Sequence, residues 1–300
     1  MDKRGLLLFA AMCVIWGIPY LLIKVAVEEL SAAMLVFART AIAALLLLPL
    51  AAMRGELRAL LPYWAPVLAF AAIEIALPWL LLGVAEQSIS SSLTALLIAG
   101  VPLVGAVIAR TTGARERLGV QAGVGLLVGL AGVAAIVGFN LEGGPLPIAA
   151  MGVVAVCYAV GPVILQRYLA GVPALGVIAA SLGVTALVYL PIAAFSVPDA
   201  MPSAKVVGSV LGLAVVCTAI AFVLFFALIT EVGPVRATVI TYVNPAVAAV
   251  LGVAILGEDF TVGMGVGFVL VLAGSVLATR PSAAAPPAEI SALEPARDPI

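Results

Sequence analysis

The sequence repeats itself with an offset of 142 residues, and this duplication limits the folds open to the chain more than any other feature. The pairs that the offset superimposes include Trp16 with Tyr158, Pro49 with Pro191, and Glu116 with Glu258. Around Pro102 and Pro245 the offset becomes 143 residues. We therefore expect two units of the same kind, residues 1–140 and residues 141–280, followed by a short tail.

Both units consist of apolar stretches that are too hydrophobic for a water-soluble protein. Hydrophobic residues make up 65% of the chain and charged residues 10%, with a mean hydropathy of +1.30, whereas soluble domains are about half apolar and about a quarter charged. A bilayer core requires about 20 apolar residues per helix. Ten spans are predicted, at 5–26, 31–53, 64–85, 90–109, 118–138, 147–167, 173–195, 205–229, 236–256 and 261–279. The predicted fold class is an all-α polytopic membrane protein.

The number of spans in each unit determines the topology. Because five is odd, the second unit must enter the membrane from the side opposite to the first. Two inverted five-helix repeats, related by a pseudo-two-fold axis in the membrane plane, are the architecture of many secondary transporters. The tail, residues 281–300, is rich in Pro and Ala and is predicted to be a disordered cytoplasmic end.

Basic residues in the loops predict the orientation, since cytoplasmic loops collect Lys and Arg. With a cytoplasmic N-terminus, ten of them lie inside: Lys3, Arg4, Arg54, Arg58, Arg110, Arg115, Arg117, Arg167, Arg236 and Arg280. Only Lys24 and Lys205 then lie in the outer loops. Both termini are therefore predicted to be cytoplasmic. The first span lacks a cleavage pattern, so we expect it to be retained rather than removed as a signal peptide.

Several kinds of chemistry lack the residues that they require. The chain has no His, and Cys13, Cys157 and Cys217 lie singly within apolar runs, where we expect small core residues rather than metal ligands. No Gly is followed by Lys, as a phosphate-binding loop would require. We expect no catalytic residues, no metal, no cofactor and no nucleic-acid partner. The expected partners are the lipid bilayer and a small-molecule substrate.

Two ionisable residues lie deep within predicted spans, Arg39 in the second and Glu74 in the third. A charge at the bilayer centre costs about 2.5–3.5 kcal/mol on insertion scales, so both are candidates for function. Their depths differ by about 6 Å at 1.5 Å per residue, and an ion pair is therefore within reach. We predict a structural ion pair between Arg39 and Glu74. The alternative is that Glu74 is a proton site or the contact for a substrate ammonium group.

Prolines beside aromatic residues mark the first and sixth spans. Helical spacing places Trp16, Pro19 and Tyr20 on one face of the first span, and Tyr158 and Pro162 on the matching face of the sixth. A Pro removes a backbone donor and loosens the helix. Hinges or gates are predicted at Pro19, Pro78, Pro102, Pro162 and Pro245. The alternative is that these prolines are ordinary for membrane helices and that the rings only pack.

Further substrate contacts are predicted on three other spans. They are Phe222, Phe225 and Phe226 of the eighth span, Trp79, Leu82 and Gly83 of the third, and Thr238, Thr241 and Tyr242 of the ninth. With Trp16, Tyr20, Glu74 and Tyr158 they predict an apolar binding site with few polar contacts, as small-molecule sites usually are. Lipid contact or core packing is the alternative for the aromatic residues.

Glycines in the fifth and tenth spans have spacings that let helices approach closely. They are Gly123, Gly125, Gly129 and Gly132 in the fifth span, and Gly263, Gly265, Gly267 and Gly274 in the tenth. Helix packing is the prediction for these glycines, and a dimer or scaffold face is the alternative. A monomer is the expected unit.

The motifs of both halves resemble those of a known family. They are Trp16-Gly17, Lys24, Arg39 within FART, Pro102 and ERLGVQAGVGLLVGLAGV in the first half, and Ala227, GPVRAT, Asn244-Pro245, LGE ending at Glu258 and GVGFVLVLAGSV in the second. From about residue 5 to 280 the chain is similar to the drug/metabolite transporter superfamily in its ten-helix EamA form, and within it to bacterial aromatic amino-acid exporters. The resemblance implies export of small metabolites through a central cavity that opens alternately to each side.

The expected function is therefore that of a secondary transporter and not of an enzyme. We expect it to export small metabolites, above all aromatic and other neutral amino acids, across the bacterial inner membrane. The alternative is a proton-coupled exporter of multiple drugs or quaternary amines. The deep carboxylate of Glu74 favours that alternative, because a cation is attracted by a carboxylate and by aromatic faces.

Overall fold

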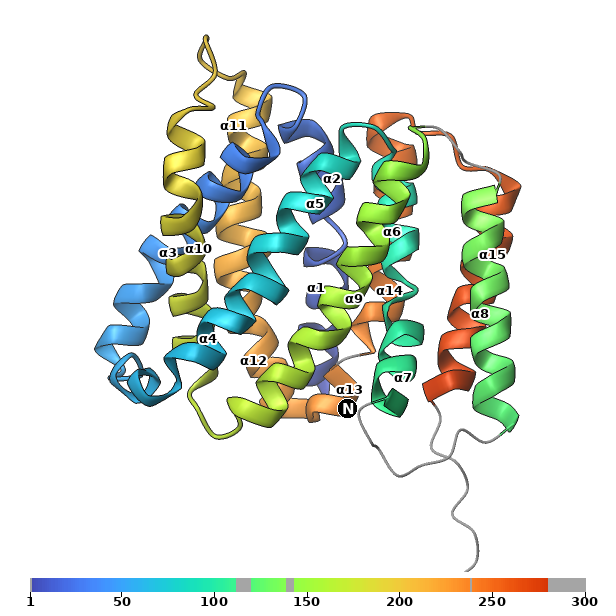
Figure 1. Ribbon diagram of the computed structural model, residues 1–300, viewed down its shortest axis with the longest axis horizontal. Coiled ribbons are helices and arrows are strands. Elements are labelled where there is room, and N and C mark those ends of the chain that lie inside the picture. The colour runs from blue at the N-terminus through green and yellow to red at the C-terminus, as the bar shows by residue number, and fades with distance from the viewer. Residues whose placement is uncertain (1, 112–119, 139–142, 238, 280–300) are drawn as a thin grey trace, which may run out of the picture.

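A computed structural model describes residues 2–111, 120–138, 143–237 and 239–279 of the chain (Figure 1). All regular structure in these ranges is helical. The helices are α1 (Lys3–Ile15), α2 (Pro19–Ala26), α3 (Ala32–Met53), η1 (Arg58–Tyr63), α4 (Trp64–Phe70), η2 (Ala71–Ala76), α5 (Leu77–Glu86), α6 (Ser91–Ile98), α7 (Val101–Thr111), α8 (Val120–Gly138), α9 (Pro145–Tyr168), α10 (Ala174–Ala194), α11 (Ala204–Leu211), η3 (Gly212–Ile220), α12 (Ala221–Val232), α13 (Pro234–Ala237), α14 (Ile240–Leu256) and α15 (Val262–Thr279). The predicted tail, residues 281–300, lies outside the described residues.

Within the described ranges, nine helical stretches are long and apolar enough to cross a bilayer. A tenth, α14, is apolar but has only 17 residues. These ten stretches coincide with the ten predicted spans; the second, for example, is predicted at 31–53 and observed as Ala32–Met53. The predicted all-α polytopic fold class is therefore confirmed.

The first span is interrupted where its sequence combines an aromatic residue, a glycine and a proline. Helix α1 ends before Trp16, and α2 begins at Pro19. A proline has no N–H to donate, so the helical ladder cannot continue through it unchanged. Gly17 in this break lies so close to α14 that an added Cβ would be 2.6 Å from Val247. The break thus brings the backbone of the first span against the ninth.

The other predicted hinge prolines lie in different settings. Pro102 follows directly on the interruption between α6 and α7, whereas Pro162 and Pro245 lie inside the continuous helices α9 and α14. Pro78 is in the first turn of α5, where a missing N–H is tolerated. Proline therefore coincides with a broken helix in the first and fourth spans only.

Corresponding parts of the third and eighth spans, η2 and η3, are π-helical. The wider turn is visible in the hydrogen bond that the Thr218 hydroxyl donates to the Leu213 carbonyl oxygen, five residues earlier, at 2.8 Å. π-helical turns are rare in proteins overall, but those that occur are often found at functional sites. Glu74 lies in η2 and Thr218 in η3, so both wide turns carry a polar side chain into the bundle.

The helices pair as two related halves require. Helix α3 packs against α10, α8 against α15, and α6 against α14, so each of these spans meets its counterpart in the other half. Helix α5 of the first half packs against α9 of the second half. Helix α12, the counterpart of α5, packs against α1, the counterpart of α9, so the same contact occurs with the two halves exchanged. Figure 1 shows α8 and α15 together at one edge of the bundle and α3 and α10 near the opposite edge. The packing thus follows an approximate two-fold relation.

Glycines bring α8 and α15 into close contact. A Cβ added at Gly125 would lie 2.5 Å from the backbone nitrogen of Ala278, and one added at Gly132 would lie 2.7 Å from the carbonyl oxygen of Gly267. Larger residues at these positions would force the two backbones apart. The predicted close packing is therefore observed at Gly125, Gly132, Gly267 and Gly274, whereas nothing lies within 4 Å of a Cβ added at Gly123.

We call the end of the bundle that carries the N-terminus the lower end and the opposite end the upper end, as they lie in Figure 1. At the upper end, the Ser203 backbone N–H donates to the Glu29 carboxylate at 2.6 Å, and Lys205 pairs with Glu28 at 3.3 Å. Hydrogen bonds from the Ser203 hydroxyl and backbone hold the pKa of Glu29 below its usual value. These contacts join the turn after α2 to the start of α11.

Candidate functional site

The polar centre of the bundle is built around Arg39 of α3, which is 7% exposed. Its Nε donates a hydrogen bond to Thr218 Oγ1 at 2.9 Å. Its guanidinium carbon lies 3.6 Å from the centre of the Trp79 ring, which is a cation–π contact. Arg39 therefore ties α3 to η3 and to α5 without using a carboxylate.

The predicted ion pair between Arg39 and Glu74 is wrong. Among the described side chains, the ion pairs within 4 Å are Arg4 with Glu231 and Lys205 with Glu28. The prediction assumed straight α-helices, whereas Glu74 lies in the π-helical segment η2. A π turn takes in an extra residue and therefore rotates the side chains around it relative to an α-helix. Arg39 consequently contacts the eighth span, and Glu74 faces the sixth.

Glu74 directs its carboxylate against Gly161 of α9. A Cβ added at Gly161 would fall on Glu74 Oε2 and 2.8 Å from the Glu74 carboxyl carbon, so a glycine leaves the room that this carboxylate needs. Oε2 is buried and has no hydrogen-bond partner in the described part of the protein. A buried acceptor without a donor is costly. Glu74 is therefore placed to accept a hydrogen bond or a positive charge from a ligand.

Tyr158 of α9 joins the two ionisable groups. It lies close enough to Glu74, Arg39 and Tyr20 to interact electrostatically with each of them, and it lies beside the Trp79 side chain. Tyr20 of α2 is 9% exposed and is close to Arg39 as well. The structure thus brings five of the predicted site residues into one polar centre.

An aromatic cluster adjoins this centre on the side of α12. The Trp16 ring lies 4.6 Å from that of Phe225 and 5.8 Å from that of Phe222, with an interplanar angle of 75° in the second pair. The Phe222 and Phe226 rings are 6.2 Å apart. Phe222 comes one helical turn after Thr218, which holds Arg39. The predicted faces of the first and eighth spans therefore meet, and they meet next to the polar centre.

Leu82 and Gly83 take part in core packing and not in this centre. Leu82 is buried in the main hydrophobic core of the bundle. A Cβ added at Gly83 would lie 2.9 Å from the Cβ of Ala32, so this glycine allows α5 to approach α3 closely. Both residues therefore contribute to core packing rather than to substrate contact.

Tyr242 of the ninth span contacts the tenth span. The Tyr242 hydroxyl is 3.4 Å from Thr279 Oγ1 of α15, and Thr241 is exposed. Thr238 lies outside the described residues. This contact of Tyr242 does not join it to Glu74 or Arg39, so Tyr242 lies apart from the polar centre.

Two residues of the centre and its surroundings were not predicted as site residues. Thr218 lies four residues before Phe222, and extending the helical face of Phe222 by one turn would have found it. Glu86 falls at the predicted end of the third span, where a carboxylate is expected to be solvated. In the structure it is fully buried. Burial of a residue at the end of a span depends on neighbouring helices and is invisible in the local sequence.

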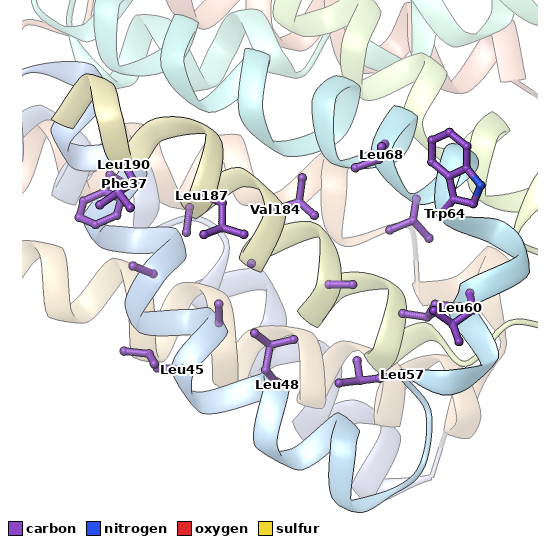
Figure 2. A pocket seen from close by; sticks show the side chains of 17 residues that line it. Phe37, Leu45, Leu48, Leu57, Leu60, Trp64, Leu68, Val184, Leu187 and Leu190 are labelled. Carbon is purple, nitrogen blue, oxygen red and sulfur yellow. The ribbon is translucent and has the colours of Figure 1, made fainter. Parts of the chain in front are cut away.

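An apolar groove of about 720 Å³ opens elsewhere, between α3, α10 and the segment from η1 to α4 (Figure 2). Figure 2 shows Phe37, Leu45 and Trp64 among the side chains that line it. None of its lining residues belongs to the polar centre or to the predicted site. Because the groove lies along membrane-spanning helices and exposes Leu45, we regard it as part of the surface that faces lipid.

The described residues offer no arrangement suited to a metal. No group of three or more His, Cys, Asp or Glu side chains lies close enough together there to hold a metal ion. Cys13, Cys157 and Cys217 are buried and unpaired with one another, as predicted for small core residues.

The sequence also matches known membrane proteins. Residues 3–138 and again residues 146–280 match the EamA-like transporter family. An uncharacterized inner membrane transporter of Escherichia coli strain K12, YedA, is 32% identical over 260 residues, which cover 84% of this chain and 82% of YedA. YedA of Escherichia coli O157:H7 is similar to the same extent. A solved crystal structure with 20% identity has a TM-score of 0.64 over 93% of this chain and 97% of that chain, a likeness of fold alone.

The bundle of apolar helices, its interrupted spans and these matches define the class, which is that of polytopic membrane transporters. Within this class the chain belongs to the EamA-like transporter family, as its motifs predicted.

Proposed function

We propose that this protein is a secondary transporter of the inner membrane that exports small metabolites, with aromatic and other neutral amino acids as the substrate class. The substrate binds at the polar centre and leaves by alternating access, and one copy of the chain is the transporting unit. The lower end of the bundle is cytoplasmic in this proposal, because exposed Arg54, Arg58 and Arg167 lie in its turns and cytoplasmic loops collect such residues.

The observation that carries the proposal is that Arg39 and Glu74 both lie near Tyr158 without forming an ion pair with each other. An amino acid at neutral pH carries one carboxylate and one ammonium group. A site that holds a guanidinium and a carboxylate apart from each other is complementary to both groups. Glu74 would accept hydrogen bonds from the ammonium group of the substrate. Arg39 would bind the substrate carboxylate and would keep its cation–π contact with Trp79.

The aromatic cluster supports the choice of an aromatic or otherwise apolar side chain. Trp16 and Phe222 meet edge to face at 5.8 Å, and Phe222 lies one turn from the residue that holds Arg39. A ring inserted beside them would gain contacts worth about 0.5–1.5 kcal/mol beyond the burial of its surface. The charged groups would thus bind the backbone of the amino acid, and the cluster would bind its side chain.

A test of the site is the substitution Tyr158→Ala, with Tyr168→Ala as the matched control. Tyr168 belongs to the same helix but is exposed at the lower end. We expect Tyr158→Ala to reduce saturable phenylalanine counterflow in proteoliposomes by about tenfold or more, the effect of losing about 1.4 kcal/mol of binding. Tyr168→Ala should transport normally. Unchanged flux through well-folded Tyr158→Ala protein would remove Tyr158 from the site.

A proton-coupled exporter of cations is the second candidate, and the unpartnered Oε2 of Glu74 near the Tyr158 ring favours it. The two candidates differ in substrate. Proteoliposomes would be loaded with labelled phenylalanine, threonine or methionine, or with a lipophilic cation, each with and without a pH gradient. Saturable amino-acid flux supports the first candidate. Proton-driven cation flux without amino-acid flux supports the second.

A further inference from the structure

A second buried carboxyl group lies at the upper end of the third span. Glu86, the last residue of α5, is 0% exposed. Neither of its carboxylate oxygens has a hydrogen-bond partner in the described part of the protein. The third carboxylate oxygen that is buried without a partner in the described part is Oε2 of Glu74.

The charged groups around Glu86 are already engaged with helix ends. Lys24 Nζ donates to the carbonyl oxygens of Glu86 and Ile89 at 2.5 and 2.9 Å, at the C-terminus of α5. Glu258 accepts from the backbone N–H groups of Ser91 and Ser92 at 2.7 and 2.9 Å, at the N-terminus of α6. Lys24 and Glu258 are the charged side chains that act on Glu86 electrostatically. Lys24 and Glu258 thus each bind a helix terminus, and the Glu86 carboxyl group is left without a partner.

The titratable side chains that face Glu86 and its neighbours form a series through the bundle. Tyr20 of α2 interacts electrostatically with Glu86 and with Arg39 of α3. Tyr158 of α9 interacts with Tyr20, with Arg39 and with Glu74 of η2. Glu86 and Glu74 are twelve residues apart on one span, which corresponds to roughly 18 Å along a helix. Tyr20 is thus near Glu86, Tyr158 is near Tyr20 and Glu74, and the two tyrosines link the surroundings of the two carboxyl groups.

We propose that Glu86 is a proton-binding site at which protons enter from the upper end of the bundle, and that Tyr20 and Tyr158 connect it to Glu74. A proton binds the Glu86 carboxylate to give a neutral carboxyl group, which needs no counter-charge in its buried setting. Each tyrosine hydroxyl takes up one proton and gives one on, so neither changes its charge. The proton that reaches Glu74 neutralises the carboxylate there.

Proton arrival at Glu74 would release the substrate toward the upper end, because a proton and a substrate ammonium compete for one carboxylate. The protein would then exchange one proton moving from the upper to the lower end for one substrate moving the opposite way. The coupling in this inference rests on the proposed export function, whereas proton binding at Glu86 does not.

The test uses the full-length protein in proteoliposomes that contain a pH-sensitive dye. We expect phenylalanine gradients to drive proton movement through the wild type. In Glu86→Gln this movement should fall to the level of protein-free liposomes, whereas phenylalanine counterflow, which needs no net proton movement, should persist. Glu28→Gln is the matched control, because Glu28 lies at the same end but is exposed and paired with Lys205. It should move protons as the wild type does.

Two results would overturn the inference and leave the export function standing. One is wild-type proton movement in Glu86→Gln, and the other is phenylalanine counterflow without any proton movement in the wild type. Loss of counterflow together with proton movement in well-folded Glu86→Gln would also overturn it, since Glu86 would then bind substrate. Should Glu86→Gln not fold, Glu86→Met keeps the length of the side chain and removes its titratable group, and the same loss of proton movement with retained counterflow is expected.

A readout without substrate separates this inference from the proposed function. In an infrared pH titration of the purified protein, the carboxyl band of protonated Glu86 should be present in the wild type and in Glu28→Gln and absent from Glu86→Gln. If no phenylalanine flux is found, the proposed substrate class fails, and the infrared band alone decides whether Glu86 binds a proton. Identical titrations of wild type and Glu86→Gln would overturn proton binding at Glu86.

Discussion

Gly161 has its role because of what lies opposite it on another span. The Glu74 carboxylate occupies the volume that a Cβ at position 161 would fill. Neither residue reveals this relation within its own helix, since 87 positions separate them in the sequence. At the scale of single residues, the position of the Glu74 carboxylate therefore depends on the absence of a Cβ at Gly161.

We expect Gly161→Ala to displace the Glu74 carboxylate and to reduce transport by about tenfold or more, as the loss of about 1.4 kcal/mol of binding would. Gly152→Ala on the same helix is the control, because nothing lies within 4 Å of a Cβ added there. Phenylalanine counterflow and the melting temperature of both purified variants are the measurements. Transport at the wild-type rate in Gly161→Ala would show that Glu74 does not need its observed position.

Helices related by the repeat have diverged in their continuity. The first span is broken between α1 and α2 before Pro19, whereas the corresponding sixth span is the continuous helix α9, with Pro162 inside it. Half-helices that end near the centre of the membrane are typical of secondary transporters, where they line the binding site. The Trp16 ring, which contacts the aromatic cluster, lies in the break itself.

The roles of Pro19 and Pro162 can be compared with matched substitutions. Pro19→Ala restores a backbone donor and favours a straight first span. We expect it to lower the turnover rate with little change in the apparent affinity for phenylalanine, because the residue acts on movement and not on contact. Pro162→Ala, at an exposed position of α9, should leave both quantities unchanged. Equal turnover in the two variants would contradict a hinge at Pro19.

At the scale of the whole molecule, the glycine contact of α8 and α15 stands apart from the site. These helices lie together at one edge of the bundle (Figure 1). Their backbones approach through Gly125, Gly132 and Gly274, and no residue of the polar centre belongs to either helix. We therefore assign this pair to stability and the remaining spans to transport.

Substitutions on α8 separate these two roles. In Gly125→Ala the new Cβ would meet the Ala278 nitrogen at 2.5 Å, and we expect a destabilisation of about 1–3 kcal/mol, as is usual for overpacking. Gly123→Ala, with nothing within 4 Å of the added atom, should be neutral. Thermal unfolding in detergent is the measurement. A Gly125→Ala protein as stable as Gly123→Ala would mean that the helices can separate without cost.

The spans were predictable because each is a local property of the chain. A run of about 20 apolar residues has to cross the bilayer whatever its neighbours do, and the ten predicted stretches are helical in the structure. Helical spacing had placed Trp16 and Phe222 on the predicted site faces of the first and eighth spans, and the two rings do meet. The orientation of the termini stays a prediction from loop charges.

The partners of the buried charges were not predictable. Arg39 and Glu74 have compatible depths, which favoured an ion pair, but the π turn of η2 changes the direction of Glu74. The burial of Glu86 was missed for a similar reason, because α2 and the turn after α14 cover a helix end that looks exposed in sequence. The sequence predicts how far along a helix a side chain lies. The direction in which the side chain points around the helix axis changes with every irregular turn, and the sequence did not predict it.

The sequence alone determined that this protein is an all-α polytopic membrane protein, because hydrophobicity and helix length act locally. Only the tertiary structure decided that Arg39 binds Thr218 and Trp79, that Glu74 faces Gly161 and that Glu86 is buried without a partner. Those facts depend on how helices rotate and approach one another. Such rotations are fixed by contacts between residues far apart in the chain, and no local pattern records them.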